Sequence, residues 1–255
     1  MTATDDRKLA QVLRQLHLTG MLDTLEARLA EARAGRLGHV EFLEVLCQDE
    51  LARRDAAAVT RRIRQAHFPR EQTLEAFDFA YNKTLPAATI RDLARLSFIE
   101  TGEGILFYGP VGVGKSHLAV ALGHLACRRG YDVWFTTSSK LLATLAGGHA
   151  DRSFAQRVAR LAKPGLLIVD DWAMREFTVS QADDVFELLS ERLERPRRSL
   201  ILTSNRSPSD WYPLFPNAVV GESVLDRLLN SSHHVLLEGK SYRPNRRPGR
   251  QRTEG

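Results

Sequence analysis

The sequence predicts an α/β protein in which a small domain made of helices precedes a three-layer αβα domain built on a parallel sheet. In the first 75 residues, apolar side chains recur every three or four positions without strand-like alternation, which is typical of helices. From about Ile105 the pattern changes to short apolar runs separated by helical stretches, which predicts βαβ units and a sheet covered on both faces. We therefore expect a helical domain over residues 1–75, an α/β domain over 76–243 and a basic tail over 244–255.

The helical region is predicted to hold a hairpin and then one long helix. A break at residues 34–38 ends the hairpin, and the long helix runs from about His39 to Gln65, before Pro69. At 100° per residue, one side of this helix is apolar and the opposite side is basic. The apolar stripe consists of Ala52, Ala56, Val59, Ile63 and Ala66, and the basic side of Arg53, Arg54, Arg61 and Arg64. The basic side is either an ordinary solvated surface or one that contacts phosphates.

Five short apolar runs are predicted to be buried parallel strands. These runs are Ile105–Tyr108, Val133–Phe135, Leu166–Val169, Leu200–Leu202 and Val235–Leu237. About 18 residues follow the last run, and the final dozen, rich in Pro, Arg and Gly, are expected to be disordered in isolation.

The composition excludes several classes of protein. With 255 residues, 43% hydrophobic and 26% charged, the chain is neither a disordered nor a fibrous protein. No apolar run approaches the roughly 18 residues of a membrane span, and residues 1–10 lack a signal-peptide pattern, so we expect a cytoplasmic protein without a membrane partner. Cys47 and Cys127 lie too far apart for a zinc ribbon.

The net charge of +5 comes from one end of the chain. Six basic residues and one acidic residue follow residue 238, so residues 1–238 balance at 30 basic and 30 acidic. The sequence therefore describes a neutral body with a basic tail.

A phosphate-binding loop follows the first predicted strand. Residues 109–116 read Gly-Pro-Val-Gly-Val-Gly-Lys-Ser and fit the pattern GxxxxGK[ST] between a strand and a helix. Glycines let backbone N–H groups curl around a phosphate, and the helix presents its positive end to the same anion. Lys115 is expected to hold the β- and γ-phosphates and Ser116 to bind Mg²⁺, so ATP and Mg²⁺ are the predicted cofactors. The predicted nucleotide-binding residues are Gly109, Pro110, Val111, Gly112, Val113, Gly114, Lys115, Ser116 and His117.

Polar residues follow two later strands. Asp170 and Asp171 come directly after Leu166–Val169, and Asn205 follows the next strand. Because ligands bind outside the carboxyl ends of parallel strands, we expect Asp170 to hold Mg²⁺ and Asp171 to orient or deprotonate the attacking water. Asn205 is placed to hydrogen-bond the γ-phosphate or that water. The alternatives are that the two acids cap a helix and that the asparagine belongs to a turn.

These motifs carry a family resemblance. In order, GPVGVGKS, LLIVDD, ILTSN and LDRLLN resemble the initiator and helicase-loader branch of the AAA+ ATPases. The phrases LHLTGML, EFLEVLCQDELARR, RIRQAHFP, TLEAFDF, KSHLAVALG and GKSYRP resemble the IstB family across nearly the whole chain. Members of that family are ATP-binding helper proteins of bacterial insertion sequences, and the DnaC type of helicase loader is related to them.

The resemblance implies an ATPase that forms a homo-oligomer with ATP on double-stranded DNA and works with the transposase encoded beside its gene. In that pattern Arg227 matches the arginine finger that acts on a neighbouring subunit's nucleotide. The alternative is that Arg227 only packs on its own helix. Lys140 matches the region that touches DNA, and a solvated lysine is the alternative. Arg53, Arg54, Arg61 and Arg64 then become candidates for DNA binding.

Two departures from the AAA+ pattern stand out. Asp171 stands where many members have glutamate, and its shorter side chain puts the water-activating role in question. The residues after Leu237 are too few for a C-terminal lid domain, so a lid-borne sensor arginine is missing unless Arg243 replaces it. Residues 77–81 resemble the family's link into the ATPase core and either border the adenine or form a packed linker.

Three functions are compatible with a phosphate-binding loop. The N-terminal phrases favour a transposition ATPase over a DnaC-like replicative helicase loader. A small-molecule kinase would leave Arg227 and the basic helix side without a role. The gene beside this one separates the first two readings, since a transposase gene supports the first and replication genes support the second.

Overall fold

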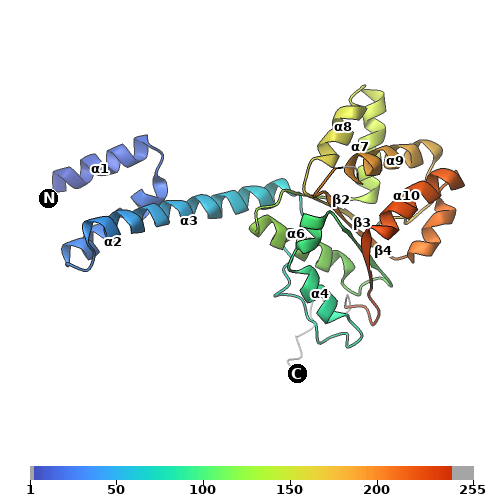
Figure 1. The fold of residues 1–255 in the computed structure, drawn as a ribbon, viewed down its shortest axis with the longest axis horizontal. Coiled ribbons are helices and arrows are strands. Elements are labelled where there is room, and N and C mark those ends of the chain that lie inside the picture. Colours follow the sequence, from blue (N-terminus) through green and yellow to red (C-terminus); the bar gives the residue numbers. More distant parts are fainter. Residues whose placement is uncertain (1–2, 194, 243–255) are drawn as a thin grey trace, which may run out of the picture. The chain divides into compact units, whose positions relative to one another are not determined.

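The computed structural model describes residues 3–193 and 195–242, which form two compact units, one up to Arg61 and one from Arg62 on (Figure 1). Arg243 and the predicted basic tail over residues 244–255 lie outside the described residues. The units divide earlier than the predicted boundary at residue 75, because the segment after residue 61 packs on the α/β unit. There the N–H of Phe135 donates to the carbonyl of Ala66 at 2.8 Å.

The first unit is helical, as predicted. It consists of α1 (Ala3–Gln15), α2 (Thr19–Arg33) and the part of α3 (His39–Gln65) up to Arg61. The periodicity places both ends of α3 where the structure has them. Four buried leucines form the centre of a small core: Leu13, Leu25, Leu29 and Leu46.

A buried carboxylate organises this unit. Glu50 is 3% exposed, and its carboxylate accepts hydrogen bonds from the guanidinium groups of Arg53 at 3.0 Å and Arg54 at 2.7 Å and from the N–H of Gly20 at 2.6 Å. The hydrogen bond from Arg53, with help from Arg54 and Gly20, lowers the pKa of Glu50 to about 2. Arg53 and Arg54 therefore neutralise a buried acid.

The two sides of α3 match their prediction in part. Of the apolar stripe, Ala66 is buried and Ile63 packs against a core cluster, whereas Ala52 and Ala56 are exposed. Helical periodicity marks which residues share a side of a helix, but it does not show that another element covers that side. On the basic side, Arg61 and Arg64 are exposed and form no ion pair with a described residue, whereas Arg53 and Arg54 share Glu50.

The second unit is a three-layer αβα domain on a parallel sheet, as predicted. Its strands pair in the order β2-β3-β4-β1-β5, and every pair is parallel. The strands are β1 (Gly104–Tyr108), β2 (Val133–Thr137), β3 (Leu166–Asp170), β4 (Ser199–Ser204) and β5 (Ser232–Leu236). The fifth begins three residues before its apolar run, because it is an edge strand whose exposed histidines interrupt the apolar pattern.

Helices cover both faces of the sheet (Figure 1). In one core cluster, alternate residues of the strands, such as Ile105, pack against α4 (Ala87–Leu93), α5 (Ser97–Thr101) and α6 (Lys115–Arg128). In the other cluster, the intervening strand residues, such as Leu106, pack against α7 (Ser138–Ala150), α8 (Phe154–Ala162), α9 (Val179–Leu193), the 3₁₀ helix η1 (Pro208–Leu214) and α10 (Ala218–Asn230).

Two kinds of helix are absent from the described part of the chain. In residues 237–242, which follow β5, there is no helix. Within residues 3–193 and 195–242, no helix combines the length and the apolar character that crossing a membrane requires.

One buried cation joins a helix to the sheet. Arg192 of α9 is 1% exposed, and its guanidinium donates to the carbonyls of Leu161 at 2.9 Å, Ala162 at 3.2 Å, Pro164 at 3.2 Å and Ser199 at 2.6 Å. Burial lowers its pKa to about 9. The guanidinium thus satisfies the last carbonyls of α8 and the first carbonyl of β4.

Replacing Arg192 with methionine should destabilise the α/β unit, because four buried carbonyls lose their donor. We expect the free energy of unfolding to fall by about 3 kcal/mol in chemical denaturation followed by circular dichroism. Arg195→Met is the matched control, since Arg195 forms a partly exposed ion pair with Glu191 and should contribute less than about 1 kcal/mol. Equal losses for the two variants would contradict the role assigned to Arg192.

Candidate nucleotide-binding site

The glycine-rich loop has the backbone shape that its sequence requires. It joins β1 to α6, and Gly109, Gly112 and Gly114 have φ angles of 130°, 86° and 107°. A Cβ atom on Gly114 would lie 2.7 Å from the Phe77 ring. A larger residue is therefore disfavoured here for two reasons, the positive φ angle and the lack of space. The loop therefore ends at the N-terminus of α6, where backbone N–H groups and the positive end of the helix dipole stabilise an anion.

Lys115 and His117 start α6 and are both held by backbone carbonyls. The Lys115 side chain is mostly buried, and its Nζ donates to the carbonyls of Gly109 at 2.7 Å and Pro110 at 2.6 Å. The His117 Nε2 lies 3.0 Å from the carbonyl oxygen of Thr73. The loop thus contains an ammonium group placed to meet phosphates.

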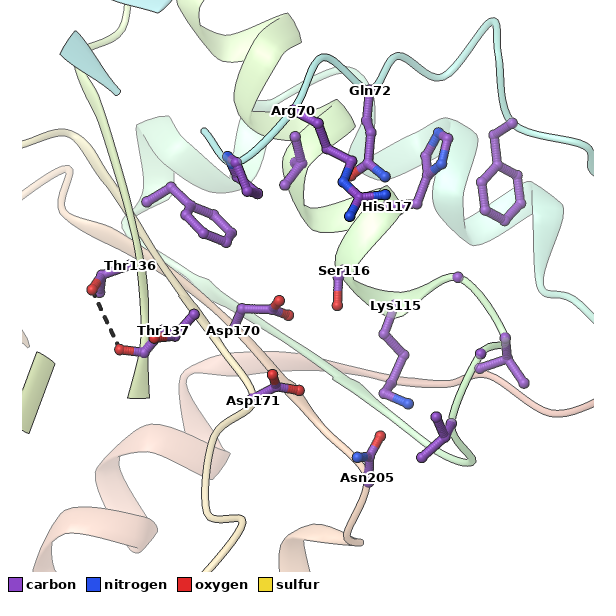
Figure 2. Close-up of a pocket in the computed structure, with 18 of the residues that line it drawn as sticks. Arg70, Gln72, Lys115, Ser116, His117, Thr136, Thr137, Asp170, Asp171 and Asn205 are labelled. Atoms are coloured by element: carbon purple, nitrogen blue, oxygen red, sulfur yellow. Dashed lines mark hydrogen bonds between the residues drawn. The ribbon is translucent and has the colours of Figure 1, made fainter. Parts of the chain in front are cut away.

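The two acids lie at the carboxyl end of β3. Asp170 is the last residue of the strand and is half-buried, whereas Asp171 is exposed and has a φ of 56°. Asn205 follows β4, the neighbouring strand, and its amide donates to the Met174 sulfur at 3.4 Å. Figure 2 shows that all three side chains face the same space as Lys115 and Ser116.

One cleft of about 1780 Å³ brings most of the predicted site together. Its lining includes residues 111–117, both acids, Asn205 and also Lys140, which was predicted to contact DNA. Gly109 and Pro110 do not line the cleft. Their carbonyls instead accept hydrogen bonds from the Lys115 ammonium within the loop. Arg227 is exposed on α10, does not line the cleft, and its predicted role in a neighbouring subunit remains a prediction.

Other lining residues were not predicted. Arg70 and Gln72 come from the segment after α3, and Figure 2 shows both side chains directed toward the cleft. Tyr242 comes from the end of the described chain; its N–H donates to the carbonyl of Gly112 at 2.9 Å, and its ring meets the ring of Tyr81 at 4.8 Å. No local motif signals these residues, because they reach the cleft from segments far apart in the sequence.

The oxygen groups of the cleft fit Mg²⁺. The Ser116 hydroxyl and the Asp170 carboxylate face one another in Figure 2, and such hard donors are those that Mg²⁺ prefers. No cluster of three or more His, Cys, Asp or Glu that could hold a metal occurs within residues 3–193 and 195–242. The two oxygen donors of Ser116 and Asp170 suit a cation that nucleotide phosphates and water also coordinate, which is typical of Mg²⁺.

Comparisons with known proteins find ATP-binding proteins of insertion sequences. The sequence profile described as IstB-like ATP binding protein matches residues 11–249. An insertion-sequence ATP-binding protein of Mycobacterium tuberculosis is 56% identical over 245 residues, which cover 96% of this chain and 97% of that protein. The ATP-binding protein of the insertion sequence IS21 from Pseudomonas aeruginosa is 34% identical over 92% of this chain and 88% of its own length.

A solved structure extends the likeness to the fold. The crystal structure of the DnaC helicase loader superposes with a TM-score of 0.54 at 20% identity, covering 70% of this chain and 99% of that one. The likeness to DnaC shows the fold of the α/β unit, whereas the sequence matches show the family. Because the profile and both relatives span nearly the entire sequence, the chain belongs to the IstB-like family of insertion-sequence ATP-binding proteins.

Proposed function

We propose that this chain is a Mg²⁺-dependent ATPase that assembles with ATP on double-stranded DNA and assists the transposase of its insertion sequence. The observation that carries the proposal is the convergence of the glycine-rich loop, Asp170, Asp171 and Asn205, from three neighbouring strands, on one cleft. The insertion-sequence relatives favour transposition over helicase loading. The likeness to DnaC supports only the shared fold.

Five residues of the cleft and one arginine outside it have distinct tasks in the proposed hydrolysis. Lys115 neutralises charge on the β- and γ-phosphates, while Ser116 and Asp170 hold Mg²⁺, which withdraws charge from the phosphates when bound. Asp171 accepts the proton of the attacking water, and the Asn205 amide orients that water or the γ-phosphate. Arg227 of a neighbouring subunit stabilises charge on the departing phosphate, which makes hydrolysis depend on assembly.

Two separate parts of the chain are proposed to contact DNA: the basic side of α3 and Lys140. Arg61 and Arg64 are the stronger candidates on α3, because both are exposed and form no ion pair with a described residue. Arg53 and Arg54 share the charge of Glu50 and offer less to a phosphate. An oligomer repeats these weak contacts, so binding should be tighter with ATP and should fall with salt.

Reversing Arg61 and Arg64 together to glutamate should weaken ATP-dependent DNA binding about tenfold or more, because each subunit loses two phosphate contacts. The measurement is fluorescence anisotropy of labelled duplex DNA over a range of salt concentrations. Arg53 and Arg54 stay unchanged, since reversing them would leave Glu50 among repelling charges. The double reversal of Arg91 and Arg95, both exposed, changes net charge equally and should have little effect.

Deletion of residues 244–255 is run beside these variants, because the tail is a rival source of basic charge. If the deletion abolishes binding and the reversal on α3 has no effect, the tail is the DNA-binding element and α3 is a solvated surface. Nucleotide affinity of each variant, measured with a fluorescent ATP analogue, should equal that of the wild type.

A further inference from the structure

A single buried hydroxyl joins the two acids of the cleft. Thr203 lies in β4 and is 1% exposed. Its hydroxyl donates to Oδ1 of Asp170 and accepts the N–H of Asp171 at 3.1 Å. Its carbonyl accepts the N–H of Trp172 at 2.7 Å. The residue therefore contacts three consecutive positions at the end of β3.

The backbone that Thr203 contacts is strained. Asp171 and Ala173 both have a φ of 56°, in the left-handed region that residues with a Cβ seldom adopt. Such a conformation persists only where the surroundings hold it. Here β4 supplies the support, through Thr203 and through Ser204, whose hydroxyl donates to the carbonyl of Trp172 at 2.9 Å.

The same hydroxyl also sets the orientation of the Asp170 carboxylate. Because Oδ1 accepts from Thr203, Asp170 is limited in the rotation of its side chain. Among the described residues Oδ2 has no hydrogen-bond partner, so it is available to a cation. Partners of this kind orient the groups that bind a metal, and their loss typically lowers metal affinity or activity about 10- to 100-fold.

We propose that Thr203 is a positioning residue whose hydroxyl aligns Asp170 for Mg²⁺ and holds the backbone of Asp171 in the left-handed conformation. The inference rests on the proposed function, in which these two acids hold the cation and activate water. The hydroxyl is needed in both directions, as donor to a carboxylate and as acceptor from a backbone N–H. Valine, of similar shape, supplies neither interaction, whereas serine supplies both.

The test compares Thr203→Val, Thr203→Ser and Ser204→Ala. Ser204 is a matched control, since it is the next residue of β4, is 1% exposed, and its hydroxyl likewise donates to a carbonyl and accepts an N–H, that of Arg206 at 3.1 Å. It touches neither acid through its side chain. The affinity of each variant for a fluorescent ATP analogue is measured in EDTA and across a Mg²⁺ titration, and thermal unfolding reports stability.

Thr203→Val should bind the analogue in EDTA like the wild type but should need about tenfold more Mg²⁺ for the half-maximal change in affinity. Thr203→Ser should restore the wild-type Mg²⁺ dependence. Ser204→Ala should lower the unfolding temperature without shifting the Mg²⁺ dependence. If Thr203→Val proves unfolded, Thr203→Ala, which cannot overpack the site, takes its place with the same expectation.

Two outcomes overturn the proposal: an unchanged Mg²⁺ requirement in the hydroxyl-free variant, or an equal shift in Ser204→Ala, which would indicate a merely structural contribution of β4. Neither readout uses hydrolysis. A wild-type chain that binds the analogue with Mg²⁺ but does not release phosphate would therefore contradict the proposed ATPase activity, while the comparison among the Thr203 variants would still decide the role of the hydroxyl.

Discussion

Lys115→Ala should lose tight ATP binding, with an affinity at least about a hundredfold lower than that of the wild type. The ammonium of Lys115 is mostly buried and held at the loop by two carbonyls, so it meets the phosphates without a large loss of side-chain freedom. Removing it deletes charge-assisted hydrogen bonds to two phosphates. Equilibrium titration of a fluorescent ATP analogue measures the loss directly.

The matched control for this variant is Lys163→Ala, which removes an exposed lysine outside the cleft. Both variants should keep their far-ultraviolet circular dichroism. Lys115→Ala with an affinity close to that of Lys163→Ala would contradict the assignment of the loop as the phosphate site. In that case the carbonyl contacts of Lys115 would serve only the shape of the loop.

Arg227→Ala should bind nucleotide as the wild type does and yet lose about 10³-fold in assembly-stimulated ATPase activity. Arg227 is exposed on α10 and does not line the cleft of its own subunit. Its guanidinium can therefore act on phosphate only across an interface between copies. Phosphate release at saturating DNA and protein, together with analogue binding by dilute protein, separates the two effects.

Mixing Arg227→Ala with Lys115→Ala sharpens the test. Some mixed interfaces join an intact loop from one variant to an intact arginine from the other, so partial recovery of activity is expected. Asp226→Ala, the neighbouring change on the same helix, serves as a control with near wild-type activity. Absence of recovery, where light scattering shows that the two variants assemble together, would mean that Arg227 does not act in trans.

Much of the site was predictable because its functional residues lie in short contiguous segments of the sequence. The loop at residues 109–116 lies between β1 and α6 as its pattern requires, and its glycines have the positive φ angles for which glycine is selected. Asp170 lies at the end of β3 because four apolar residues before it form a buried strand. Parallel strands then bring this acid and Asn205 to the same edge of the sheet.

Features that depend on partners far along the chain were not predictable. Glu50 looks like any acid of a surface helix, yet it is buried because Gly20, thirty residues earlier, lets the two helices approach closely. The same contact uses Arg53 and Arg54, which the sequence pattern alone presents as free charges. Helical periodicity describes one helix and carries no record of what packs against it.

The sequence by itself determined the order of helices and strands, the phosphate-binding loop and the acids at the end of β3, because local hydrophobic periodicity and backbone conformation encode each of them. Only the tertiary structure decided that Thr203 bridges both acids and that Tyr242 closes against the loop and Tyr81. These contacts join residues separated by 32 to 161 positions. They exist only after the strands have taken their order in the sheet, since pairing of β3 with β4 is what places Thr203 beside Asp170.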